Sequence, residues 1–199
     1  MTRDLVRALV VFVALTVICG LAYPVVVWGI GQAAFPDAAD GSLIRVDGRV
    51  VGSARMGQGF ASDVYFQPRP SAVDYSSVPA GDPASLGASG GSNLGPNAQE
   101  LADTVAQRLQ DRAALEGVDP SKVPVDLLTA SASGVDPDIS VPAARLQVPR
   151  VARARSLDPT AVEALVDDHV IDKTFGFLGT DRVNVLRLNL ALDRLAPAQ

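Results

Sequence analysis

The chain has 199 residues and a formal net charge of −5 at neutral pH, which allows one ordinary domain but no transport pathway with many membrane spans. The acidic balance argues against general nucleic-acid binding, because neutralising phosphates needs clustered Lys and Arg. Cys19 is the only cysteine, so the rest of the chain forms no disulfide and no thiolate metal site.

An uncharged apolar run near the N-terminus predicts a membrane-spanning helix over residues 8–34. Its first 23 residues, 8–30, carry no charge, and as a helix they span roughly 35 Å, enough to cross the hydrocarbon core. Three alternatives stay open. These are a buried core helix, a cleaved signal peptide, and a lipoprotein modified at Cys19, although a bulky Ile18 precedes that cysteine.

The charges on either side of this run predict its orientation. Arg3 and Arg7 precede it, and the first charges after it are acidic, Asp37 and Asp40. By the positive-inside rule, residues 1–7 are cytoplasmic and residues 35–199 form an extracytoplasmic domain. We therefore expect a single-pass protein of the cell membrane.

Three residues of the span favour contact with another helix. Trp28 lies near the outer end, where an indole prefers the headgroup region, whereas Tyr23 and Pro24 fall deeper. A kink or a packed face at this depth is more typical of a helix with a membrane partner than of a lone anchor.

The remaining chain predicts one α+β domain of mixed helices and short strands. Residues 43–51 alternate around Asp47 and Gly48, the chemistry of a type I′ hairpin. Residues 79–96 are mostly small or turn-forming and predict a loop. Apolar residues at helical spacing predict a helix over 96–115 that stops at Gly117.

Further elements are expected toward the C-terminus. Ser140 can cap a helix through residue 145, which Pro149 interrupts before residue 155. Asp158 followed by Pro159 predicts another helix start. Alternating leucines in residues 182–195 predict a strand over at least the first half of that stretch.

Candidate chemistry is sparse. The stretch SGGSNLGP at residues 89–96 could cradle an anion before a helix, with Arg55 or Arg69 nearby in sequence, but it lacks a P-loop lysine and also fits a structural loop.

Acidic residues and the one histidine give no stronger signal. Asp126, Asp136 and Asp138 fit turns or a cation site, and their spacing matches no EF-hand. His169 fits a helix C-terminal charge better than a catalytic base. We predict no catalytic residue and no metal site.

Several phrases, taken together and in order, resemble the C subunit of the Kdp-type high-affinity potassium-transporting ATPase of bacteria and archaea. They are VYF at 64–66, RPSA at 69–72, SGGSNLGP at 89–96, DLLTAS at 126–131, QVPRVA at 147–152, GFLG at 176–179 and VNVL at 183–186. Two departures are local: Asp138 stands where the family usually has histidine, and Asn97 is shifted to follow Pro96 directly.

The resemblance implies an accessory subunit that is needed for assembly and acts as a catalytic chaperone, raising the ATP affinity of the catalytic subunit. Implied partners are a channel-like potassium-binding subunit, a P-type ATPase catalytic subunit and a small helical subunit, with potassium as the transported ion. For ATP as a cofactor shared with the catalytic subunit, the implied nucleotide-binding residues are Ser89, Gly90, Gly91 and Gln147. The predicted orientation, however, turns them away from cytosolic ATP. A membrane-anchored extracytoplasmic hydrolase using His169 and a small-ligand-binding module at residues 89–96 stay open as alternatives.

Overall fold

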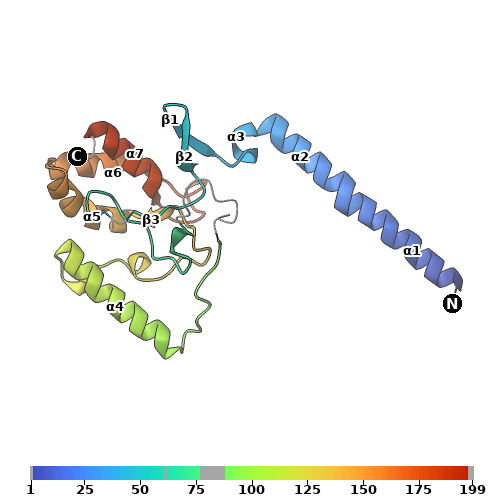
Figure 1. Ribbon diagram of the computed structural model, residues 1–199, viewed down its shortest axis with the longest axis horizontal. Coiled ribbons are helices and arrows are strands. Elements are labelled where there is room, and N and C mark those ends of the chain that lie inside the picture. The colour runs from blue at the N-terminus through green and yellow to red at the C-terminus, as the bar shows by residue number, and fades with distance from the viewer. Residues whose placement is uncertain (1, 61, 77–87, 197–199) are drawn as a thin grey trace. The chain divides into compact units, whose positions relative to one another are not determined.

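The computed structural model describes residues 2–60, 62–76 and 88–196 (Figure 1). The chain forms two compact units, Met1–Ser53 and Ala54–Gln199. The boundary follows the predicted hairpin, so that the hairpin belongs to the same unit as the apolar helix.

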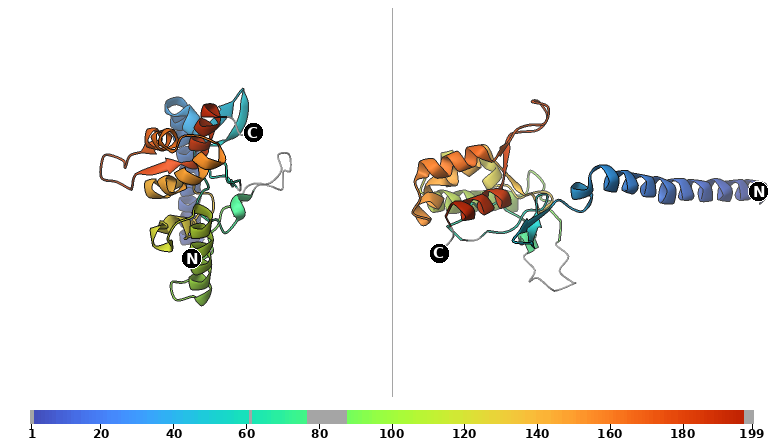
Figure 2. Two further views of the ribbon diagram at one scale, coloured as in Figure 1. Left: turned by 90° about the vertical axis from the view of Figure 1, so that its left-hand side faces the viewer. Right: turned by 90° about the horizontal axis from the view of Figure 1, so that it is seen from above.

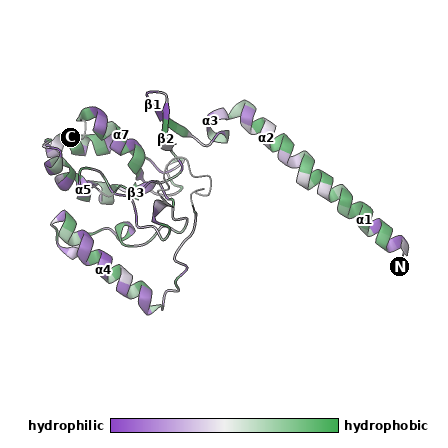
Figure 3. Ribbon diagram, in the orientation of Figure 1, coloured by the Kyte–Doolittle hydropathy of each residue, from purple (hydrophilic) through white to green (hydrophobic). Residues whose placement is uncertain are grey.

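The first unit is dominated by a continuous apolar helix. It consists of α1 (Thr2–Val17), a π-helical turn (Ile18–Ala22) and α2 (Tyr23–Ala34). Over these 33 residues, all described, no side chain is buried, and Figure 3 shows the middle of the helix coloured mostly as hydrophobic. The helix is long and apolar enough to cross a membrane.

The π-helical turn explains how the helix accommodates a proline. The N–H of Tyr23 donates to the carbonyl of Ile18, five residues earlier. Pro24 has no N–H to donate, and in a regular helix its ring would meet the carbonyl of Gly20. One widened turn before the proline keeps the helix continuous through this point.

The predicted hairpin is confirmed. After the short helix α3 (Pro36–Ala39), β1 (Leu43–Val46) pairs antiparallel with β2 (Arg49–Ser53). Asp47 and Gly48 both have positive φ, 49° and 77°, as a type I′ turn requires.

The second unit packs helices around a small antiparallel sheet with strand order β3-β5-β4 (Figures 1 and 2). The strands are β3 (Asp138–Ser140), β4 (Val170–Ile171) and β5 (Arg182–Asn184), and the helices are α4 (Gln99–Glu116), α5 (Val141–Ala154), α6 (Pro159–Asp168) and α7 (Val185–Leu195). Three 3₁₀ turns lie at Asp74–Ser76, Pro120–Lys122 and Val125–Leu127. The core is formed mainly by Phe66, Leu127, Ile139, Val151, Val162, Val166, Val183, Leu188 and Leu192. The α+β prediction is confirmed.

Local capping signals place the helix ends well. Gly117 ends α4 in the left-handed conformation, with φ 68°. Ser140 accepts a hydrogen bond from the N–H of Ala143, and Asp158 accepts one from Thr160. The start of α4 is three residues later than predicted, after the turn that contains Pro96.

The predicted interruption at Pro149 is wrong, because α5 runs unbroken from Val141 to Ala154. Because Pro149 has no N–H, the carbonyl of Arg145 lacks its usual helical hydrogen bond. Both residues are exposed. Water can therefore replace the missing bond. Buried residues on both sides of the proline, from Ala143 to Ala152, hold the helix against the core.

The predicted strand over the first half of residues 182–195 is mostly wrong. Only Arg182–Asn184 is a strand, and α7 follows at once. Asn184 accepts a hydrogen bond from the N–H of Arg187 and so starts the helix. The buried positions Val185, Leu188 and Leu192 have helical spacing. Leucines at every second position fit the period of a strand and also supply one face of a helix, so they do not distinguish the two.

Candidate functional site

The most elaborate polar structure in the second unit surrounds residues 66–71, hereafter the 66–71 segment. The side-chain amide of Asn189 on α7 accepts from the N–H of Phe66 and donates to its carbonyl, both at 2.9 Å. Gln147 on α5 does the same for Gln67, accepting at 2.7 Å and donating at 3.1 Å. Two carboxamides thus satisfy the backbone N–H and carbonyl groups of two consecutive residues that belong to no sheet.

A buried charge network continues from Gln147. Arg150 donates through Nη2 to Gln147 at 2.8 Å and through Nε to both carboxylate oxygens of Glu116, at 3.2 and 3.1 Å. Arg112 donates to the same carboxylate at 3.3 Å and to Gln67 Oε1 at 2.9 Å. Burial lowers the pKa of the Arg112 guanidinium, and the carboxylate of Glu116 opposes that shift. The network fixes the 66–71 segment against α4 and α5.

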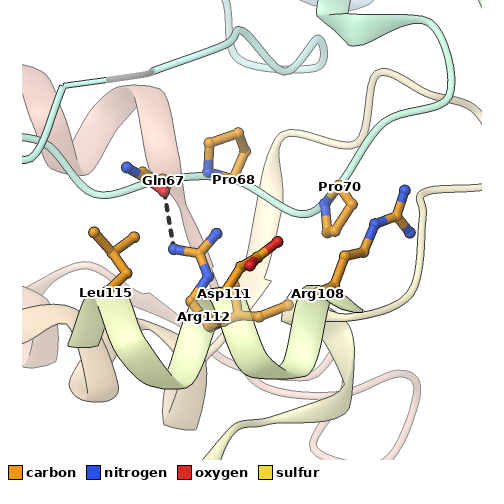
Figure 4. Close-up of a pocket in the computed structure, with 8 residues that line it drawn as sticks. Gln67, Pro68, Pro70, Arg108, Asp111, Arg112 and Leu115 are labelled. Carbon is orange, nitrogen blue, oxygen red and sulfur yellow. Dashed lines mark hydrogen bonds between the residues drawn. The ribbon is translucent and has the colours of Figure 1, made fainter. Parts of the chain in front are cut away.

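Hollows lie beside the 66–71 segment. One, drawn in Figure 4, has a volume of about 330 Å³ and is lined by Gln67, Pro68, Pro70, Arg108, Asp111, Arg112, Leu115 and Leu127. Another, of about 310 Å³, extends past Arg69 to Asp74 and Tyr75. In Figure 4 Arg112 reaches from α4 to Gln67, so this guanidinium is already engaged. Arg108 also donates to a protein carbonyl, that of Leu128, at 3.1 Å.

The structure does not bring the predicted nucleotide-binding residues into one open site. Gln147 is fully buried, and both ends of its amide are bonded to protein groups. The N–H of Gly90 donates to the carbonyl of Ser133 at 2.8 Å, and so does the hydroxyl of Ser89 at 2.9 Å. Gly91 packs against the backbone of Ala132. As folded, the Gln147 amide, the Ser89 hydroxyl and the Gly90 N–H all bond to groups of this chain.

The three candidate cation ligands do come together, around a hollow of about 210 Å³. Two of them, however, are paired with arginine: Asp136 with Arg69 and Asp138 with Arg182, each at 2.9 Å. Asp126 accepts from the N–H and the hydroxyl of Ser140 at the start of α5. These ion pairs and hydrogen bonds hold the turns on either side of β3, which is the role expected of turn residues.

His169 lies at the C-terminal cap of α6, as predicted. Its Nδ1 is 2.8 Å from the carbonyl of Leu165, on the same helix. Among the described residues, no serine hydroxyl and no carboxylate hydrogen-bonds to the imidazole. In the part of the chain that the structure describes, His169 is therefore not in contact with a nucleophile.

The three residues predicted to contact another membrane helix, Tyr23, Pro24 and Trp28, lie on α2. Pro24 and Trp28, four residues apart, share one face of the helix. Tyr23 and Trp28 are 67% and 66% exposed, so the described residues of the first unit leave this region open to another surface.

Sequence reasoning missed the residues that build the polar network, namely Glu116, Arg150 and Asn189. The one available signal was polarity within an apolar stretch, as for Asn189 among the leucines of α7. A buried polar residue on the core face of a helix needs a partner, but sequence does not say which one.

Comparison with known proteins gives a consistent result. The family model described as "K+-transporting ATPase, c chain" matches residues 5–194. The potassium-transporting ATPase KdpC subunit of Burkholderia orbicola (strain MC0-3) is 54% identical over 195 residues, 96% of each chain. The subunits of that name from Bradyrhizobium diazoefficiens and from Mycobacterium tuberculosis H37Rv are 49% and 48% identical, over 98% of this chain and 99% and 100% of theirs. The chain therefore belongs to the family of K+-transporting ATPase c chains.

Proposed function

We propose that the chain is a non-catalytic accessory subunit that anchors itself beside its partners and completes assembly of the pump. The observation that carries the proposal is the helix Thr2–Ala34, which buries none of its side chains against the described part of its own chain. A helix with Pro24 and Trp28 on one open face suits packing against another membrane helix. The partners proposed for it are the channel-like potassium-binding subunit, the P-type catalytic subunit and the small helical subunit.

The proposed orientation places residues 1–7 in the cytoplasm and residues 35–199 outside. Arg3 and Arg7 before the apolar run support it. Without Arg3, Arg7 and Asp4, the chain has 15 basic and 21 acidic residues, a net charge of −6. An acidic domain on the outer face would modestly raise the local concentration of potassium ions.

The proposed effect on ATP affinity acts through the partners. Gln147, Ser89 and Gly90 support the shape of the second unit by hydrogen-bonding to its backbone, and Gly91 lies close to the backbone of Ala132. A direct contact of these residues with ATP stays a prediction, and it would need Gln147 to leave the core. In the proposed role they keep the second unit in the shape that its partners bind.

The assembly role is tested by purifying the tagged chain in mild detergent from potassium-starved cells. We expect a P-type ATPase and a channel-like subunit to co-elute, with potassium-stimulated ATPase activity that is lost when this chain is deleted. Elution of the chain alone, together with ATPase activity that does not change on deletion, would refute the proposal.

The orientation is tested by labelling introduced cysteines in a Cys19→Ser background. Lys122→Cys is exposed in the second unit, and a maleimide that cannot cross membranes should label it in intact spheroplasts. Thr2→Cys should be labelled only after permeabilisation. The opposite labelling pattern would reverse the orientation without affecting membership of the complex.

A further inference from the structure

The loop between β4 and β5 presents two phenylalanines to solvent. Phe175 is 83% exposed and Phe177 is 73% exposed, and Leu178 beside them is 52% exposed. The two rings lie 6.5 Å apart, centroid to centroid. Both views in Figure 2 show this hairpin, in orange-red, projecting away from the helices of the second unit. Its tip, residues 172–181, is therefore an apolar projection.

Hydrogen bonds fix the shape of the tip. Thr174 and Leu178 exchange two backbone bonds, each 2.9 Å long, and the N–H of Lys173 donates to Asp181 Oδ1 at 3.0 Å. Phe175 has φ 55°, and Gly176 has φ 78°. A bulky residue rarely adopts positive φ, since it costs conformational free energy. Here the positive φ of Phe175 points its ring into solvent. Because the ring is not buried against its own chain, burial does not offset the free-energy cost of this backbone conformation.

We propose that Phe175, Phe177 and Leu178 insert into an apolar pocket on a partner subunit of the same pump, and that basic side chains line the rim of that pocket. The inference rests on the proposed accessory role, because it requires partner subunits. Aromatic anchors that fill a pocket dominate binding energy at many protein interfaces. A narrow tip fits a pocket better than a flat contact.

Charge around the tip favours a protein pocket over a lipid surface. Asp172 and Asp181 are the first and last residues of the tip, Lys173 lies beside Asp172, and all three are exposed. Their net charge is −1, and anionic headgroups would repel the two carboxylates, whereas membrane-binding segments are rich in Lys and Arg. Arginine or lysine at the pocket rim would pair with Asp172 and Asp181.

Photocrosslinking in the assembled complex identifies the occupant. We replace Phe177 with p-benzoyl-phenylalanine in the full chain, irradiate native membranes and analyse the adducts by mass spectrometry. We expect an adduct with a partner subunit, at apolar residues beside Lys or Arg. The same probe at Val125, which is 69% exposed on another surface, is the matched control. Adducts only with lipid, adducts with a second copy of this chain, or no adduct above the control would overturn the inference.

Removing the rings measures their contribution. In the double variant Phe175→Ser/Phe177→Ser, association with the other subunits should weaken by at least about tenfold per ring, as expected when a buried phenyl group is lost. Its melting temperature alone should match the wild type, because neither ring is buried. Val125→Ser is the control for a lost exposed apolar side chain. If the wild type assembles and the double variant assembles equally tightly, only this inference fails. If the wild type itself does not assemble, the accessory role fails too.

Discussion

The side-chain amide of Gln147 bonds to the peptide groups of Gln67 as a neighbouring β-strand would, accepting from its N–H at 2.7 Å and donating to its carbonyl at 3.1 Å. The two residues are 80 positions apart in the chain. Asn189 does the same for Phe66, so α5 and α7 both fix one short piece of backbone. The 66–71 segment therefore depends on carboxamides rather than on a sheet.

Replacing Gln147 with leucine should destabilise the chain strongly. Both polar groups of the Gln67 backbone would lose their partner in a partly buried setting, at a cost of about 1 kcal/mol or more each. Urea denaturation of the full chain in detergent measures the loss. Gln110→Leu, on the exposed side of α4, is the control and should change stability little. Equal stability of the two variants would mean that water replaces the Gln147 contacts.

Arg150→Met should destabilise by about 3 kcal/mol or more, because it leaves the buried carboxylate of Glu116 with only part of its partners. Both side chains are nearly inaccessible, at 6% and 0% exposure. Arg112 still donates to Glu116 at 3.3 Å, which limits the loss. Arg153 is exposed on the same helix, so Arg153→Met is the control. It makes the same change of charge and side chain and should alter stability little.

A second substitution separates the buried charge from the packing of Arg150. Adding Glu116→Gln to Arg150→Met removes the uncompensated carboxylate and should recover part of the stability. If the double variant loses as much stability as the two single losses added together, or more, the pair does not interact as described.

Gly134→Ala should both destabilise the second unit and loosen the turn at Gly90. Gly134 has φ +71°, and a Cβ there would lie 2.5 Å from the carbonyl oxygen of Gly90 and 2.5 Å from Val73. Together with the left-handed backbone, the crowding should cost roughly 2 kcal/mol or more. Hydrogen exchange of the Gly90 amide, which donates to Ser133, should speed up.

Gly117→Ala is the matched control for this substitution. Gly117 also has positive φ, +68°, but a Cβ there meets nothing within 4 Å. It should show the backbone cost without the crowding and leave the exchange of Gly90 unchanged. If both variants lose the same stability, the close approach of Gly134 to Gly90 contributes nothing.

Local chemistry made the hairpin and the helix ends predictable from sequence. The turn residues Asp47 and Gly48, the stop at Gly117 and the cap at Asp158 act within a few residues of themselves. The period of residues 182–195 was ambiguous, because leucine at every second position satisfies a strand and also supplies Leu188 and Leu192 to one helix face.

Long-range pairing explains what sequence reasoning missed in the site. The family resemblance implies that Gln147 binds nucleotide, yet in the structure its hydrogen-bond partners are Gln67, Ala143 and Arg150. The partner of Asn189 lies 123 positions away. Such contacts depend on how α5 and α7 pack, which residue types and spacing do not specify.

Tyr75 should make stability depend on pH in the alkaline range. Its hydroxyl donates to the carbonyl of Arg69 at 2.7 Å. Burial, and after it the nearby carboxylate of Asp136, raise the pKa of Tyr75 to about 12, although the Arg69 guanidinium partly opposes both effects. Because the folded pKa exceeds the unfolded value of about 10, the neutral phenol stabilises the fold. This contribution is complete below pH about 10 and is lost as the pH rises toward 12.

The difference in ultraviolet absorbance between the wild type and Tyr75→Phe isolates the titration of this phenol. In the folded chain the midpoint of that difference should lie near pH 12, and in urea it should return to about 10. Tyr75→Phe should also flatten the fall in unfolding free energy between those two pH values. A folded midpoint near 10 would mean that Tyr75 is open to water and that its hydrogen bond to Arg69 does not form.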